Sequence, residues 1–177
     1  LLNEGYVIIA PDYEGLGTPG MHPYLNLKSE ANSAIYAVKA YKERYGNQIN
    51  GQWMSVGQSQ GGHGSLGTAE FSNTDSNYKG AVAGAPASSL GYIISVVAPQ
   101  AIRDILQKEQ AGTAPVGTAV EVYAELLAYA AYTTVGVTAY EPKFNYRDVF
   151  KDRSKNIAQF AEGSTGENGL CLDELHN

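Results

Sequence analysis

Short apolar runs alternate with amphipathic segments in the first half of the chain. Tyr6–Ala10 is a continuous apolar run rich in β-branched residues, which is typical of a strand buried on both faces of a parallel sheet. Two more short strands are predicted at about residues 52–56 and 79–83, each followed by a glycine. Apolar positions three and four residues apart predict a helix over Ser29–Tyr45, and a second helix is expected over Gly64–Phe71. This alternation predicts an α/β fold with a mostly parallel sheet and crossover helices.

The pattern changes near Val97, and no strand is predicted beyond that point. We expect residues 1–97 to form part of a sheet-containing core and residues 98–177 to form a helical region. Val120–Thr134 is apolar around most of its circumference, so it is either a helix buried among others or one that lines an apolar substrate channel. The helices predicted in this region are Ala98–Ala111, Val120–Thr134 and Phe150–Glu162, with a connector at Tyr140–Tyr146.

Composition and charge narrow the classes of function. The chain has 177 residues, with 12 Lys and Arg against 18 Asp and Glu, and its net charge is −6. An acidic chain without basic blocks is a poor candidate for binding the phosphate backbone of nucleic acids. The chain contains no run of about 18 apolar residues, so no transmembrane segment is predicted. Cys171 is the single cysteine, so it is either a buried or free thiol or half of a disulfide whose partner lies outside this sequence.

Gly57–Gly61 has the sequence GQSQG, which matches the G-x-S-x-G pattern of a nucleophile elbow. A predicted strand enters this motif and a predicted helix leaves it, as a tight turn that lifts Ser59 above the sheet requires. Gly57 and Gly61 are expected where strand and helix approach too closely for side chains. The backbone N–H of Gln60 would then be one donor of an oxyanion hole, worth about 3–4 kcal/mol in the transition state. The alternative is that Ser59 merely caps a helix.

Four segments, in this order, resemble the α/β-hydrolase superfamily and, more narrowly, its secretory lipases. The segments are GYVIIAPDYEGLG (Gly5–Gly17), the predicted helix Ser29–Tyr45, GQWMSVGQSQGGHGSL (Gly51–Leu66) and GAVAGAPASSL (Gly80–Leu90). The resemblance covers the first half of the chain, and the helical second half matches, in position only, a cap inserted after the sixth strand. The resemblance therefore implies an α/β-hydrolase fold with an inserted helical cap, of which only central strands are present.

The resemblance also implies what lies outside this sequence. Tyr6–Ala10 would be the fourth strand of the family's sheet, with the earlier strands upstream of Leu1 and the triad acid and histidine beyond Asn177. The rest of the hydrolase domain would be needed to complete the fold, because a three-stranded parallel sheet needs neighbours at its edges and helices on both faces. A secreted or cell-envelope location is suggested by the resemblance alone.

The histidines also favour a general base outside this sequence. His22 lies in a loop after the first predicted strand. His63 comes four residues after Ser59 in the departing helix, where it would pack under the elbow. His176 is at the end of the chain, three residues after Asp173, and that spacing puts both on one helix face and not in a Ser–His–Asp relay.

Asp12 ends the first predicted strand, where an unpaired buried carboxylate would be costly. It is either a hydrogen-bonded structural residue or, as its match to the D-x-E-G aspartate of the secretory lipases implies, a second oxyanion donor. A carboxyl group can donate a hydrogen bond only when it is protonated, and burial favours that form. Tyr13 and Glu14 are candidates for the rim of the same site.

These features predict a serine hydrolase that cleaves carboxylic esters, a lipase or esterase, through an acyl-enzyme on Ser59. The substrate would be a small-molecule or lipid ester, and a lipid ester would bring the protein into contact with a lipid interface. The chemistry requires no metal or organic cofactor. Two alternatives remain open. The same elbow serves serine peptidases and acyltransferases, and a non-catalytic binding module could keep the elbow without a triad.

Overall fold

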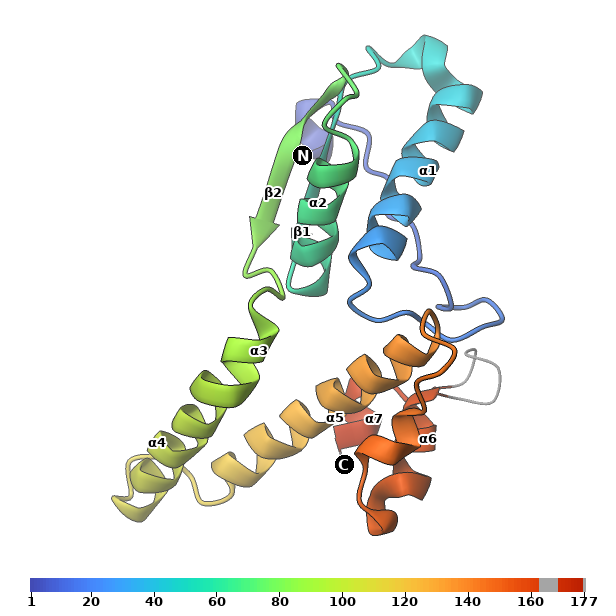
Figure 1. Cartoon of the computed structure of the whole chain (residues 1–177). Coiled ribbons are helices and arrows are strands. Elements are labelled where there is room, and N and C mark those ends of the chain that lie inside the picture. Colours follow the sequence, from blue (N-terminus) through green and yellow to red (C-terminus); the bar gives the residue numbers. More distant parts are fainter. Residues whose placement is uncertain (163–168, 177) are drawn as a thin grey trace. The chain divides into compact units, whose positions relative to one another are not determined.

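The computed structural model describes residues 1–162 and 169–176, except for the side chains of Ile157 and His176. These residues form an α/β protein with a small two-stranded parallel sheet and several helices (Figure 1). The chain divides into two compact units. Unit 1 consists of Leu1–Thr18 and Leu25–Ala87, and unit 2 consists of Pro19–Tyr24 and Ser88–Asn177.

The boundary between the units falls after Ala87, earlier than the position near Val97 that the sequence suggested. The reason is that helical backbone begins at Leu90 and continues past Val97 without a break. The residues on both sides of Val97 therefore belong to one helical rod and stay in one unit.

The sheet of unit 1 pairs β1 (Trp53–Gln58) with β2 (Tyr78–Gly84) in parallel. The first residues of the two strands face each other, and so do their last residues. The crossover between the strands is α2 (Gln60–Phe71), which packs on both of them. The strands predicted at 52–56 and 79–83 are confirmed, and each runs slightly further than its apolar pattern.

The second helix of unit 1 is α1 (Leu27–Tyr45), which packs on α2 (Figure 1). It begins where Asn26 caps its first turn, because the Asn26 side-chain oxygen accepts a hydrogen bond from the Ser29 N–H at 3.0 Å. The predicted helix Ser29–Tyr45 is confirmed, with a start two positions earlier that this cap sets.

Tyr6–Ala10 does not form the strand that its apolar pattern predicts. Strand pairing within the described residues is confined to β1 and β2, and Tyr6, Val7 and Ile8 are about half exposed. A groove of about 610 Å³ is lined by this segment, by one flank of α1 and by the start of β1. An extended segment becomes a strand only when its N–H and C=O groups pair with a neighbouring chain, and this segment borders a groove instead.

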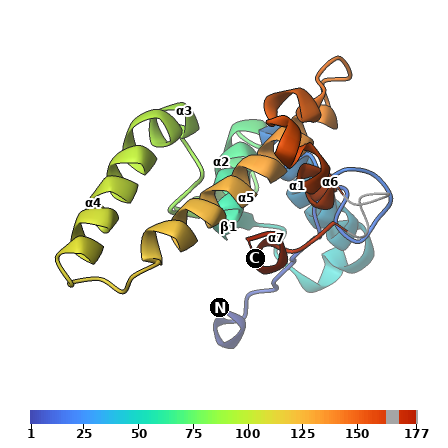
Figure 2. The ribbon, with the colours of Figure 1, turned by 90° about the horizontal axis from the view of Figure 1, so that it is seen from below.

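Unit 2 is helical, as the sequence predicts, and a continuous rod of α3, a π-helical turn and α4 leads through a loop to α5 (Figure 2). Its elements are α3 (Leu90–Tyr92), the π-helical turn Ile93–Val97, α4 (Ala98–Gln110), α5 (Thr118–Thr138), α6 (Lys155–Glu162) and α7 (Leu172–His176). Short 3₁₀ turns lie at Tyr146–Val149 and Asp152–Ser154, and in unit 1 at Leu2–Glu4 and Gly46–Gln48. The helix predicted over Phe150–Glu162 is therefore interrupted at its start.

The core of unit 2 is small and apolar. Val135 of α5, Tyr146 and Ala158 of α6 are buried together, and side chains such as Met21 and Phe150 pack against them. The hydroxyl of Tyr146 donates to Glu162 on α6, which ties the 3₁₀ turn to that helix.

The helix α5 buries one face and exposes another, although its residues are apolar around most of the helix. Ala128 and Ala131 are buried, whereas Val120, Tyr123 and Leu127 are 70%, 52% and 50% exposed. The exposed residues recur at spacings of three and four, which places them on one face of the helix. No helix in the described ranges combines the length and apolar character that a membrane span requires.

Candidate active site

Ser59 occupies a strained turn between β1 and α2. Its backbone has φ 54° and ψ −118°, outside the conformations that side-chain-bearing residues usually adopt, and such a residue costs about 1–3 kcal/mol. Its side chain is exposed and makes no capping hydrogen bond to α2. The alternative that Ser59 is an ordinary helix cap therefore fails, and the hydroxyl is held outside the sheet and the helix.

Three backbone hydrogen bonds hold this turn in place. The N–H of Ser59 donates to the carbonyl of Gly84 at the end of β2, at 2.9 Å. The Ser59 carbonyl accepts from the N–H of His63 at 3.0 Å and from the N–H of Ala87 at 3.3 Å. The turn is thus tied to the neighbouring strand and to its own helix, which is the kind of support that a strained residue needs.

Close approach of backbones explains part of the glycine pattern. A Cβ atom at Gly57 would lie 2.0 Å from the carbonyl oxygen of Gly61, and one at Gly62 would lie 2.8 Å from the oxygen of Gly84. The expectation of a close approach is confirmed at Gly57. It is wrong for the side-chain position of Gly61, where a Cβ atom would meet nothing within 4 Å, because that position points away from the contact with the strand.

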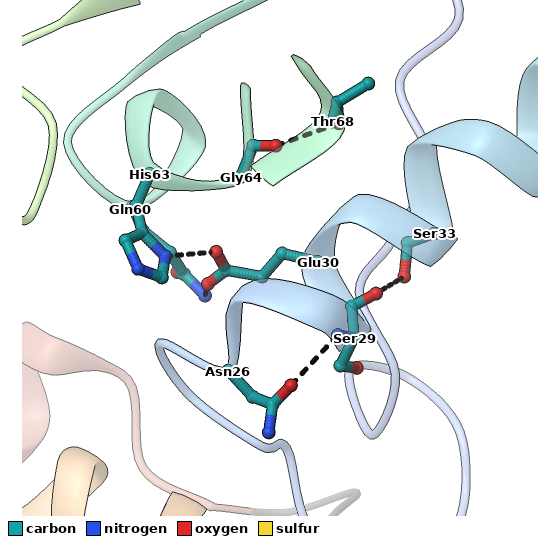
Figure 3. A network of polar contacts seen from close by, with 8 residues as sticks. All are labelled: Asn26, Ser29, Glu30, Ser33, Gln60, His63, Gly64 and Thr68. Atoms are coloured by element: carbon teal, nitrogen blue, oxygen red, sulfur yellow. Dashed lines mark hydrogen bonds and ion pairs between the residues drawn. The ribbon is translucent and has the colours of Figure 1, made fainter. Parts of the chain in front are cut away.

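A buried polar network lies beside the first turn of α2 (Figure 3). The side chain of Glu30, on α1, is 1% exposed, and its Oε2 lies 2.7 Å from Nδ1 of His63. Its Oε1 accepts a hydrogen bond from Nε2 of Gln60 at 3.0 Å. No pattern in the sequence marks this network, because Glu30 lies in a helix with ordinary apolar spacing, about thirty positions before its partners.

Tyr13 adjoins the same network. A Cβ atom at Gly64 would lie 2.9 Å from the Tyr13 hydroxyl and 3.2 Å from Cβ of Glu30, so both side chains lie against the backbone of α2. Burial raises the pKa of Tyr13, and the negative charge of Glu30 raises it further. Tyr13 is therefore a neutral phenol at ordinary pH. Glu14 accepts a hydrogen bond from the Ser29 hydroxyl at 2.7 Å, which ties the same loop to α1.

Asp12 is exposed and follows a segment that forms no strand. The expectation of a buried carboxyl group at a strand end is wrong for this structure, because Tyr6–Ala10 forms no strand and lies on a groove. Asp12 remains a candidate oxyanion donor only through its place in the sequence.

His63 and His22 lie in different units of the protein. His63 turns Nδ1 toward Glu30, in keeping with the predicted packing role beside the elbow. His22 belongs to unit 2, where its ring meets Tyr24 edge-on with centroids 5.9 Å apart. The side chain of His176 lies outside the described residues. Cys171 is an exposed thiol, and the described part of the chain holds no group of three or more His, Cys, Asp or Glu that could bind a metal ion.

No protein-family model, curated protein or solved structure matches this chain. The geometry of the turn is therefore the main guide to its chemistry. An exposed hydroxyl on a strained strand-to-helix turn can act as a nucleophile. Backbone N–H groups in the first turn of a helix point out of its N-terminal end, and Gln60 begins α2 directly after that hydroxyl. The arrangement suits attack on a carbonyl followed by stabilisation of the resulting oxyanion.

Proposed function

We propose that this protein is a serine hydrolase of carboxylic esters, built on an α/β-hydrolase fold, with Ser59 as its nucleophile. The observation that carries the proposal is the backbone of Ser59 at φ 54° and ψ −118°, between a parallel strand and a glycine-packed helix, with its side chain exposed. Strained conformations of this kind cluster at functional sites. The G-x-S-x-G pattern of the sequence supports the same assignment.

In the proposed reaction, Ser59 Oγ attacks the ester carbonyl and its proton passes to a histidine base. The base then protonates the departing alcohol, and water hydrolyses the acyl-enzyme to release the acid and regenerate Ser59. The Gln60 N–H donates to the oxyanion of each tetrahedral intermediate. Asp12 is the candidate for a second donor.

The substrate that we propose is an ester with an apolar acyl chain, as the resemblance of the sequence to secretory lipases implies. We expect turnover of p-nitrophenyl esters to depend on acyl-chain length, and hydrolysis of these esters to exceed that of peptide amides.

The test is ester hydrolysis by the full-length protein and two matched variants. Ser59→Ala removes the nucleophile, and kcat is expected to fall by a factor on the order of 10⁶. Ser89→Ala is the control, because Ser89 also has a positive φ of 53° at the start of a helix, but β2 ends at Gly84 and does not run directly into it. Equal loss in both variants, or none in Ser59→Ala, would remove Ser59 from the reaction.

A further inference from the structure

The carboxyl group of Glu30 is buried away from water. It is the one carboxyl side chain among the buried residues of the described chain, at 1% exposed. A carboxylate buried to this degree is stable only when it is paired and hydrogen-bonded. Each of its oxygens has a different partner: Oε2 lies 2.7 Å from His63 Nδ1, and Oε1 accepts from Gln60 Nε2 at 3.0 Å.

These two partners stand one turn apart on α2. Gln60 is its first residue and His63 its fourth, so the carboxylate spans the whole first turn from the side of α1 (Figure 3). Its negative charge is favourable there, because the N-terminal end of a helix carries partial positive charge. The stem of Glu30 is fixed as well, since its Cβ lies against the α2 backbone at Gly64.

We propose that Glu30 is a positioning residue for the oxyanion donor: its carboxylate holds the side chains of Gln60 and His63 and so fixes the direction of the Gln60 backbone N–H. The inference rests on the proposed ester hydrolase and deepens it. The side chain and the N–H of Gln60 share one Cα atom, so restraining the side chain limits rotation of the whole residue. A misplacement of about 1 Å at a catalytic group can cost about 100-fold in rate.

The experiment compares Glu30→Met with Glu30→Gln in the full-length protein. Methionine keeps the length of the side chain but accepts from neither partner. Glutamine keeps one acceptor for His63 and one donor for Gln60, whose amide can turn to present its oxygen. Active sites are counted by fluorophosphonate titration, so kcat is expressed per functional site and a loss of folded protein does not lower it.

For Glu30→Met we expect kcat per titrated site to fall about 10- to 100-fold with KM nearly unchanged, because a donor that acts in the transition state is misplaced. Glu30→Gln should stay within a few-fold of the parent protein. If Glu30→Met fails to fold, Gln60→Ala replaces it in the test. This variant removes the hydrogen bond from Gln60 Nε2 to Glu30 at a partly exposed position and keeps the backbone N–H. It should lower kcat about 10-fold.

The control is Thr68→Val. Thr68 is also fully buried on α2, where its hydroxyl donates to the Gly64 carbonyl at 2.8 Å, but it does not touch Gln60. This variant should lose stability and keep the kcat of the parent protein. Parental kcat per site in both Glu30→Met and Gln60→Ala would overturn the inference while leaving the proposed function intact. A parent protein that neither turns over esters nor reacts with the fluorophosphonate would overturn the proposed function itself.

Discussion

The two units of this protein bury different kinds of residue. In unit 1 the polar residues Glu30, Ser65, Thr68 and Ser72 are buried, and glycines bring backbones into contact. In unit 2 the buried side chains are apolar, mostly alanines of α5 together with the core around Val135. Directional hydrogen bonds fix distances and angles, whereas apolar contacts fix little more than proximity. Unit 1, which holds the strained Ser59, is therefore the unit whose interior depends more on hydrogen bonds of defined geometry.

The hydroxyl cluster between β1, β2 and α2 shows how unit 1 achieves this. The Ser55 hydroxyl lies 2.7 Å from that of Tyr78, and the Ser65 hydroxyl donates to Ser55 Oγ at 2.9 Å. Ser55 and Tyr78 come from the two strands and Ser65 from the helix. The three elements that form the elbow are therefore linked by side-chain hydrogen bonds as well as by packing.

The largest expected effect is at the strand–helix contact of unit 1. Gly57→Ala would place a Cβ atom 2.0 Å from the Gly61 carbonyl, which is possible only if strand and helix move apart. We expect a loss of about 3 kcal/mol or more in the free energy of unfolding, followed in urea by the fluorescence of Trp53, the single tryptophan, on β1.

The matched variant is Gly61→Ala, whose Cβ atom would meet nothing within 4 Å. It should be neutral or slightly stabilising, because alanine is the better helix former by up to about 1 kcal/mol. Equal losses in the two variants would show that the close contact at Gly57 does not define the elbow.

A smaller effect is expected at the tightest glycine of unit 2. A Cβ atom at Gly136 on α5 would lie 2.6 Å from the backbone N of Tyr24. This contact is also with backbone, but it is longer than the 2.0 Å contact at Gly57. Gly136→Ala should therefore cost less, about 1–3 kcal/mol, measured by helical circular dichroism in urea. Gly91→Ala, at an open position on α3, should not lower stability. A loss at Gly136 as large as that at Gly57 would erase the difference between the units.

The smallest effect concerns the strain at Ser59 itself. Glycine adopts positive φ without steric cost, which favours Ser59→Gly, but glycine also raises the entropy of the unfolded chain, which favours Ser59→Ala. On balance, Ser59→Gly should be more stable than Ser59→Ala by about 1 kcal/mol. Both variants should be inactive, and their melting temperatures measure the difference. If Ser59→Ala melts at the higher temperature, the turn is not strained.

Sequence patterns predicted the parts of this molecule that depend on local interactions. β1, β2, α1 and the turn at Ser59 follow from apolar runs, helical spacing and a glycine motif, each read within about twenty residues. The bridge from Glu30 to α2 joins residues 33 positions apart, and nothing in the sequence near Glu30 marks it. At Tyr6–Ala10 the local pattern predicted a strand that does not form, because an apolar run becomes a strand only if another chain segment pairs with it.

The direct test of the central claim is covalent labelling of the full-length protein with a fluorophosphonate, followed by peptide mapping. Such reagents phosphonylate a serine that is activated as a nucleophile, and the stable adduct reports which residue reacted. We predict stoichiometric labelling at Ser59, lost in Ser59→Ala and retained in Ser89→Ala. An adduct on another residue, or ester hydrolysis that continues after treatment with no adduct at Ser59, would contradict the account.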